Sequence, residues 1–322
     1  MLHRRFCAIA LPLLLAVSSQ VSAENWPTRP IKVIVPYPAG SATDVIPRTV
    51  FAEVQKALGQ PIVVENRPGA GSTLGTATVA KAEPDGYTFL VAASAYTTLP
   101  LIFPNITYDP VKDLTGVLPL ANSPSVLVIA PSKGLKTVGD LVAAARANPG
   151  AMNYVTIGPG SAAHFATERF RVVAKFQAQP VSYKGSPEGL TDVMTGRVDF
   201  YFSPLLPALP LIRDGRLSAL AVSSPQRSAD LPDVPTTVEA GYRNSEYNFW
   251  FGVFAPAKTP PDIINKLYEE SAKALTNPDV QEKLTKLGVQ PMPMTTAQFN
   301  EYVRKELRDN AELVKAAGIK FQ

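Results

Sequence analysis

The feature that most constrains this chain is a repeated unit, in which an apolar strand is followed by a loop of small residues and then by a helix. Residues 31–35 form a β-branched run that ends at Pro36, and residues 45–58 carry apolar side chains at helical spacing up to Gly59. Residues 62–64 and 87–92 are further apolar runs. This order of strand, helix and strand predicts an α/β fold, with a parallel sheet and helices on both of its faces.

Similar units continue through the rest of the chain. Apolar runs predict strands over residues 125–130, 153–157, 198–202 and 217–223. Thr137, with Asp140 three residues later, predicts a helix N-cap, and a second helix is expected from about Ala162. The C-terminal part is predicted to be helical up to Gly318. A chain of 322 residues exceeds what one core usually serves, so we expect two lobes.

The N-terminus has the layout of a cleavable secretory signal. Arg4 and Arg5 precede an apolar run over residues 6–17, and small residues follow in Val21-Ser22-Ala23. The run is shorter than the roughly 20 residues that a membrane-spanning helix needs. We expect residues 1–23 to be a signal peptide that is cleaved after Ala23.

Composition excludes several classes of protein. The only cysteine, Cys7, lies within the predicted signal, so the exported chain has no disulfide and no thiol nucleophile. Removal of Arg4 and Arg5 lowers the net charge from +4 to +2, and the remaining basic residues are dispersed. A nucleic-acid binder usually carries a basic cluster, so we expect no nucleic-acid partner.

Two loops of small residues share one design. They cover residues 38–44 and 158–164, and each lies after a predicted strand and before a predicted helix. The first turn of a helix has unpaired N–H groups and the positive end of the dipole, and small residues let an anion approach them. Each loop is therefore a candidate carboxylate or phosphate site. The alternative is that the small residues serve only turn geometry and helix capping.

Several segments occur in a characteristic order along the chain. They are YPAGSATD (37–44), ENRPGAGSTLG (65–75), EPDGYTFL (83–90), YDPVKDL (108–114), GPGSAAH (158–164), SYKGSPEGLTDVMTGRVD (182–199), LPDVPTTVEAGY (231–242) and WFGVFAPAKTP (250–260). Together they resemble the periplasmic receptors of tripartite tricarboxylate transporters, the Bug-type solute-binding proteins. The resemblance runs from Pro30 to about Gly318.

The resemblance implies a type II periplasmic-binding fold, with two α/β lobes joined by two crossover segments and a ligand cleft between them. Lobe I is expected to comprise residues 24–124 and 248–322, and lobe II residues 125–247. It further implies a periplasmic receptor, not an enzyme, that captures a di-, tri- or aromatic carboxylate for the membrane subunits of a transporter. We expect a monomer that uses no cofactor and no metal.

The ligand contacts of the family carry over mainly to the two loops. The expected ligand-binding residues are Tyr37, Ala39, Gly40, Ser41, Thr43, Asp44, Ser94, Gly158, Gly160, Ser161, His164 and Ser203. Three positions depart from the family pattern. Ser41 stands where a second glycine is common, Pro47 stands where alanine is common, and Ser203 lies near a position where an acidic or amide residue is frequent. These departures leave the ligand's identity open, but not the fold.

Asp44 and His164 each have two interpretations. Asp44 either caps its helix or pairs with an ammonium group of the ligand, and the cap is favoured because Ser203 adds no second negative charge. His164 either donates to the ligand or only occupies the first turn of its helix. Once the predicted signal with His3 is removed, it is also the only histidine base for a serine hydrolase, and no GxSxG sequence accompanies it. A remaining alternative is that the ligand-loaded protein docks on a sensor histidine kinase.

Aromatic residues suggest two further hypotheses. Tyr37, Tyr96 and residues 200–202 suggest an aromatic carboxylate, although the interpretation of these residues as core residues is favoured. The chain is expected to cross between lobes near residues 121–125 and 248–252. Lobe closure around the ligand should then change the fluorescence of Trp250 and leave that of Trp26 unchanged.

Overall fold

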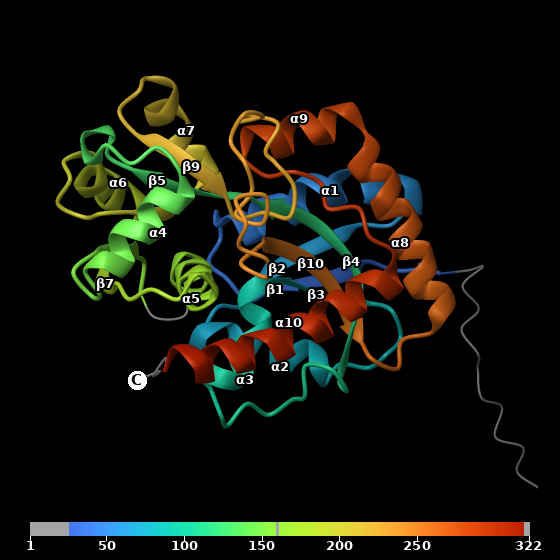
Figure 1. The fold of residues 1–322 in the computed structure, drawn as a ribbon. Coiled ribbons are helices and arrows are strands. Elements are labelled where there is room, and N and C mark those ends of the chain that lie inside the picture. Colours follow the sequence, from blue (N-terminus) through green and yellow to red (C-terminus); the bar gives the residue numbers. More distant parts are fainter. Residues whose placement is uncertain (1–25, 159–160, 319–322) are drawn as a thin grey trace, which may run out of the picture.

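Five strands form the larger sheet, in the order β2-β1-β3-β10-β4 (Figure 1). The structure is a computed structural model that describes residues 26–158 and 161–318. The strands of this sheet are β1 (Ile31–Val35), β2 (Ile62–Asn66), β3 (Thr88–Ala93), β4 (Leu114–Ser123) and β10 (Phe249–Pro256). β1 pairs in parallel with β2 and β3, as expected, but β10 pairs antiparallel with both β3 and β4. The predicted parallel pairing is confirmed for β1, β2 and β3, whereas β10 is antiparallel because it returns from a distant part of the chain and inserts beside β3.

Helices cover both faces of the larger sheet, because its strands are apolar on both sides. Val33 and Val35 face a core built with α1 (Ala42–Leu58), α8 (Pro261–Thr276) and α9 (Pro278–Lys286). Ile34 faces the opposite core, which α2 (Thr73–Ala80) and α10 (Thr296–Ala317) complete. The short elements η2 (Ala70–Ser72), η3 (Ser94–Thr97) and α3 (Leu99–Ile102) lie in the loops on that side. We refer to these elements as the large-sheet lobe.

The second lobe, here the small-sheet lobe, is built on two smaller sheets. β5 (Ser125–Ile129) pairs antiparallel with β8 (Tyr201–Pro204) and β9 (Ser218–Val222), while β6 (Asn153–Thr156) pairs in parallel with β7 (Gln179–Ser182). One core packs α4 (Val138–Ala147) and α5 (Ala162–Ala174), and the other packs α6 (Ser186–Met194) and α7 (Leu205–Arg213). The short η4 (Pro131–Lys133) follows β5.

Helix ends were better predicted than strands. Thr137 forms the predicted capping box with Asp140, and Gly318 ends α10 in the left-handed conformation. The first helix begins at Ala42 and not at Val45, because Ser41 is its N-cap. The strand expected over residues 198–202 is Tyr201–Pro204 instead, since its register is set by pairing with β5.

Two adjacent strands connect the lobes. β4 ends at Ser123 and β5 begins at Ser125, while Phe249 of β10 pairs with Ser123 on the return. The Nδ2 of Asn122 donates to the Oδ1 of Asn248 at 2.8 Å and ties the two strands together.

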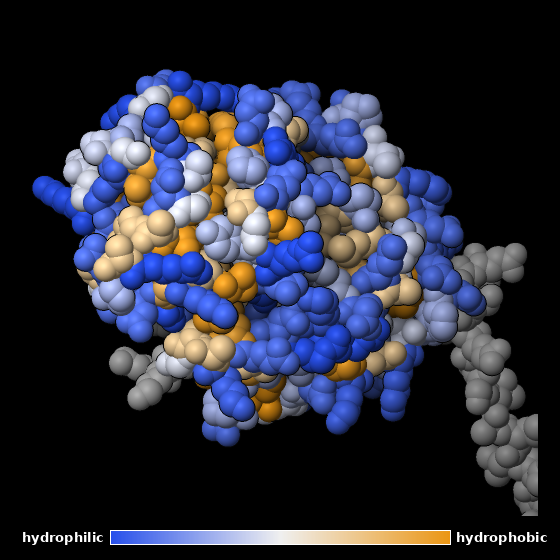
Figure 2. All heavy atoms as spheres, viewed as in Figure 1, coloured by the Kyte–Doolittle hydropathy of each residue, from blue (hydrophilic) through white to orange (hydrophobic). Residues whose placement is uncertain are grey.

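The last helix, α10, also joins the lobes. Phe299 and Val303 lie in the large-sheet core, whereas Leu313 lies in the core of α4 and α5. Figure 1 shows α10 running from beneath the larger sheet towards α5. Figure 2 shows hydrophilic residues over most of this face, with apolar residues in smaller groups between them. Among the described residues, no helix is both long and apolar enough to cross a membrane.

Candidate ligand-binding site

The first loop connects β1 to α1 and is held by the carboxylate of Asp44. One oxygen of Asp44 accepts from the backbone N–H of Gly40 at 2.8 Å. The other accepts from the Nδ2 of Asn66 at 2.9 Å and from the Nε of Arg48 at 2.8 Å. Burial alone would raise the pKa of Asp44, but these hydrogen bonds and the charge of Arg48 lower the pKa below its ordinary value. Asp44 thus binds the backbone at the start of its own helix, as the capping interpretation expects, although it lies in the first turn of α1 and the N-cap is Ser41.

Ser41 is the N-cap of α1, but its hydroxyl does not cap the helix. Among the described residues, the buried Oγ of Ser41 has no hydrogen-bond partner. Gly40 precedes it at φ 80°, a left-handed conformation that glycine adopts without strain. The start of α1 therefore offers a hydroxyl and the unpaired N–H groups of its first turn.

The second loop connects β6 to α5, and its hydroxyl groups already have hydrogen-bond partners within the protein. The Oγ of Ser161 accepts from the backbone N–H of His164 at 3.3 Å and lies 3.2 Å from the Oγ1 of Thr156. Thr156 donates to the carbonyl of Gly158 at 3.0 Å, and Gly158 has φ 101°. The expected contact Gly160 lies outside the described residues. Ser161 thus fixes the start of α5, which leaves the backbone of Ala162 and Ala163 to meet a ligand.

A cavity of about 350 Å³ lies between the lobes, where both helices begin. Ala42 of α1 lines it from the large-sheet lobe, and Ser161, Ala162 and Ala163 of α5 line it from the small-sheet lobe. The remaining lining residues are Ser123, Ser125, Ile157, Ser186, Tyr201, Phe202, Pro204, Leu206, Pro207, Phe249, Phe251, Leu287 and Val289. No charged side chain lines the cavity among the described residues, so its positive potential comes from helix starts.

The other expected contacts lie around this cavity rather than in its wall. Ala39, Gly40, Ser41 and Thr43 flank Ala42 in the first loop and its helix start, and Gly158 precedes the second helix start. Of the expected contacts that the structure describes, Ser161 alone also lines the cavity. The structure therefore brings the two predicted loops together at one cavity.

Four expected contacts have side chains committed elsewhere. The Oγ of Ser203 donates to the carbonyl of Pro204 at 2.9 Å. The Oγ of Ser94 lies 3.5 Å from the hydroxyl of Tyr247. Tyr37 packs against the large-sheet core, where burial raises its pKa.

His164, the last of these four expected contacts, lines a separate pocket of about 410 Å³ on the small-sheet lobe. Its ring stacks on that of Tyr154, with 6.5 Å between centroids. Burial lowers the pKa of His164, although the carboxylate of Glu168 opposes this shift. The imidazole is therefore held mainly in its neutral form.

Most of the cavity wall was not predicted from the sequence. Ser123, Ser125, Phe249 and Phe251 lie within the expected crossovers, so their positions were a usable signal. Leu206, Leu287 and Val289 come from helix ends far apart in the sequence, and only the folded arrangement brings them together.

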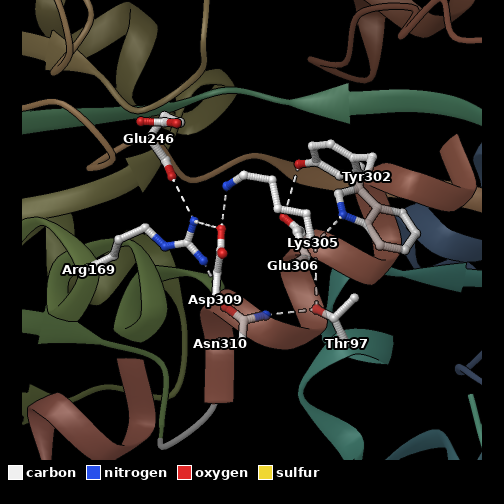
Figure 3. Close-up of polar contacts among 9 residues, drawn as sticks. Thr97, Arg169, Glu246, Tyr302, Lys305, Glu306, Asp309 and Asn310 are labelled. Carbon is white, nitrogen blue, oxygen red and sulfur yellow. Dashed lines mark hydrogen bonds and ion pairs between the residues drawn. The ribbon is translucent and has the colours of Figure 1, made fainter. Parts of the chain in front are cut away.

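A polar network, separate from the residues that line the cavity, connects the lobes through α10 (Figure 3). From α5, Arg169 donates to the Oδ1 of Asn310 at 2.9 Å and to the carbonyl of Glu246 at 3.2 Å, and it lies 3.9 Å from Asp309. The Nδ2 of Asn310 donates to the Oγ1 of Thr97 in η3 at 2.9 Å.

The network ends on the buried carboxyl of Glu306. Its Oε2 accepts from the Nε1 of Trp250 at 2.7 Å, and its Oε1 accepts from the hydroxyl of Tyr302 at 2.9 Å. Burial raises the pKa of Glu306 to about 7, and Asp309 adds to this shift, while Trp250, Arg169 and Tyr302 oppose it. Glu306 is thus partly protonated near neutral pH.

Comparison with known proteins identifies the chain's family. Residues 46–319 match the family described as the tripartite tricarboxylate transporter family receptor. This chain belongs to that family. The receptor is 36% identical to BugT of Bordetella pertussis over 311 residues, which cover 95% of this chain and 94% of BugT.

Solved structures agree with the family and with the fold. A protein of R. palustris solved with adipate has a TM-score of 0.72 and 32% identity, over 91% of this chain and 99% of its own. MatC from Rhodopseudomonas palustris, solved with bound malate, has a TM-score of 0.69 and 31% identity, over 90% and 100% of the two chains. The expected two-lobed periplasmic-binding fold is confirmed, and the protein is a substrate-binding receptor and not an enzyme. Among its described residues, no group of His, Cys, Asp and Glu is arranged to hold a metal ion.

Proposed function

We propose that this receptor captures a small organic carboxylate between its lobes in the periplasm and delivers it to the membrane subunits of a tripartite tricarboxylate-type transporter. The observation that carries the proposal is the interlobe cavity, onto which the starts of α1 and α5 both open. Two helix starts supply N–H donors and positive potential for an anion without a cationic side chain. Relatives solved with adipate and with malate support a carboxylate as the ligand.

The proposed organisation follows from the same features. Lobe I comprises residues 24–124 and 248–322, and lobe II comprises residues 125–247. The twelve residues named from the sequence form the proposed site: those of the two helix starts contact the ligand, whereas Tyr37, Asp44, Ser94, His164 and Ser203 shape the site around it. Residues 1–23, which lie outside the described residues, form a signal peptide that is removed after Ala23. The intact mass of protein purified from the periplasm tests the cleavage site.

Calorimetry with Ser161→Asp tests the carboxylate site. Aspartate is a good N-cap, so the fold of α5 should persist, but its charge would repel a carboxylate at that helix start. The affinities for adipate, malate, hexanoate and benzoate are measured with the wild-type protein. The affinity for the acid that binds most tightly is expected to fall at least 100-fold in the variant. Thr137→Asp makes the same change at the exposed N-cap of α4 and should bind as the wild type does. Tight binding of a neutral sugar, with no binding of any carboxylate, would refute the proposal.

A further inference from the structure

The wall of the interlobe cavity carries few polar groups that are free to meet a second charged end of a ligand. The hydroxyls of Tyr201 and Ser186 lie 2.9 Å apart and bind each other. The Oγ of Ser161 caps α5. Apart from Ser123 and Ser125, the rest of the described wall is hydrocarbon or aromatic, and no lysine, arginine or histidine lines it. Polar recognition is thus concentrated at the two helix starts.

The part of the wall between α7 and α9 is apolar, and the two lobes touch there. Leu206, in the first turn of α7, packs against Gly288 at the end of α9. A Cβ atom on Gly288 would lie only 2.5 Å from the Cβ of Leu206. Leu287 and Val289, on either side of this glycine, line the same cavity. The contact closes this part of the cavity with aliphatic side chains from both lobes.

Aromatic rings complete the apolar surface. Phe249 and Phe251 of β10 lie with ring centroids 5.1 Å apart in an edge-to-face arrangement, and both line the cavity. Tyr201 and Phe202 line it from β8. An ionised group placed against these side chains would lose its hydration without gaining a partner, whereas a methylene or aryl group would gain by burial.

We propose that the cavity takes a carboxylate with one charged end and an apolar body, an aromatic or short aliphatic monocarboxylate, and that Leu206 and Leu287 form the end wall that sets its length. The proposal rests on the proposed function, because it places the single carboxylate at the starts of α1 and α5. The volume of about 350 Å³ lies at the small end of the range of roughly 300–1,000 Å³ for ligand pockets. The ligand body is accordingly short.

Calorimetry with matched acids tests the ligand class. Hexanoate and adipate have the same carbon chain and differ in one end, so their comparison isolates the cost of a second carboxylate. We expect hexanoate and benzoate to bind at least tenfold more tightly than adipate and malate. Along the linear monocarboxylates from propanoate to octanoate, affinity should rise by about fourfold per buried methylene group until the end wall is reached, and then fall.

Leu206→Ala tests the end wall. The side chain of Leu206 is 46% exposed, so the variant should fold, and a thermal unfolding curve verifies this. The length of the tightest-binding monocarboxylate should increase by one or more methylene groups, whereas Leu206→Phe should shorten it. Leu74→Ala, at a leucine of α2 that is 60% exposed and does not line the cavity, is the matched control.

The outcomes separate this proposal from the receptor function. If adipate or malate binds more tightly than hexanoate and benzoate, the one-ended ligand is refuted while the carboxylate receptor stands. If no carboxylate of the panel binds, the receptor proposal itself fails. If the tightest-binding monocarboxylate has the same chain length for both Leu206 variants as for Leu74→Ala, Leu206 does not form the end wall.

Discussion

At the scale of single residues, the charged groups of the first loop, Asp44 and Arg48, bind the loop and the neighbouring strand β2. The guanidinium of Arg48 donates to Asp44, and it also donates to the carbonyl of Val64 at 3.1 Å and to the Oδ1 of Asn66 at 3.0 Å. Asp44 in turn holds the N–H of Gly40. The loop is therefore shaped before a ligand arrives, which reduces the ordering cost of binding.

Substitution of Arg48 and Asp44 should have unequal effects. Arg48→Ala leaves Asp44 bound to Gly40 and Asn66, so carboxylate affinity should fall only a few-fold. Asp44→Ala leaves three donors without their acceptor. It should lower the affinity at least tenfold and the free energy of unfolding by about 1–3 kcal/mol. Calorimetry and urea denaturation measure both effects. Loss of all binding in a folded Arg48→Ala protein would show that the guanidinium holds the anion.

Glu306 should make stability depend on pH. Its pKa is about 7 in the folded protein against an ordinary value of 4.5, so between these values the folded state keeps a proton that the unfolded chain has lost. The free energy of unfolding therefore decreases as pH rises through this window, by on the order of 3 kcal/mol in all. Well above pH 7 Glu306 is ionised in both states, so it causes no further decrease in the free energy of unfolding.

Urea denaturation at pH 5, 6, 7 and 8 checks this prediction. Glu306→Gln keeps an acceptor for Trp250 but cannot ionise, so its stability should decline less between pH 5 and pH 8 than that of the wild type. Glu282→Gln, at a carboxylate that pairs with Lys286 on the surface of α9, should leave the decline unchanged. Equal slopes for the wild type and Glu306→Gln would mean that Glu306 does not titrate in this range.

At the scale of elements, the sequence was informative where the signals were local. Thr137 with Asp140 and Gly318 mark helix ends through contacts within a few residues, and their roles were predicted. Ser161 was expected as a ligand contact, and in the structure its side chain caps α5. β4 and β10 were not predicted, because Gly116 and Pro119 interrupt β4 and both strands depend on pairing with each other. The site shows the same difference between local sequence signals and features that depend on tertiary packing. The two loops are local features, whereas Leu206 and Leu287 meet only through tertiary packing.

The two halves of α10 should respond differently to loss of Arg169. Arg169→Met removes the donor to Asn310 and Glu246, while Asp309 keeps its ion pair with Lys305 at 2.6 Å. We expect a loss of about 1–3 kcal/mol in the free energy of unfolding. Hydrogen exchange should accelerate over residues 310–317 and remain slow over residues 296–303, which pack in the large-sheet lobe.

A control on the same helix sharpens this test. Arg304 pairs with Glu301 on the surface of α10, so Arg304→Met should leave exchange in both halves unchanged. Uniform acceleration along α10 in Arg169→Met would indicate that the helix is held as one unit and not by two separate lobes.

At the scale of the whole molecule, β4, β10 and α10 connect the lobes within the part of the chain that the structure describes. β4 and β10 are paired and joined by Asn122 and Asn248, so they form a narrow waist suited to a hinge. α10 packs on both lobes and is tied to α5 through Arg169 and Asn310. Closure of the lobes around a ligand must therefore bend α10 or shift its contacts with α5.

Trp250 should report this movement although it does not line the cavity. It lies on β10 between Phe249 and Phe251, and its fully buried indole faces α10, where its Nε1 donates to Glu306. Glu306 lies 3.5 Å from Thr97, which accepts from Asn310, the partner of Arg169 on the small-sheet lobe. A rotation of that lobe therefore alters the polar surroundings of the indole. Trp26, which donates to the carbonyl of Gly86 in the large-sheet lobe, has no such connection.

Fluorescence titration of the wild type, Trp26→Phe and Trp250→Phe with the tightest carboxylate of the calorimetric panel tests the prediction. Trp26→Phe should retain the full ligand-induced change, and Trp250→Phe should bind the ligand but lose most of that change. Small-angle scattering at saturation should show a smaller radius of gyration, because closure brings the lobes together. If Trp250→Phe keeps the full change, or if scattering detects no compaction, ligand binding does not close the lobes in the way that the α10 network implies.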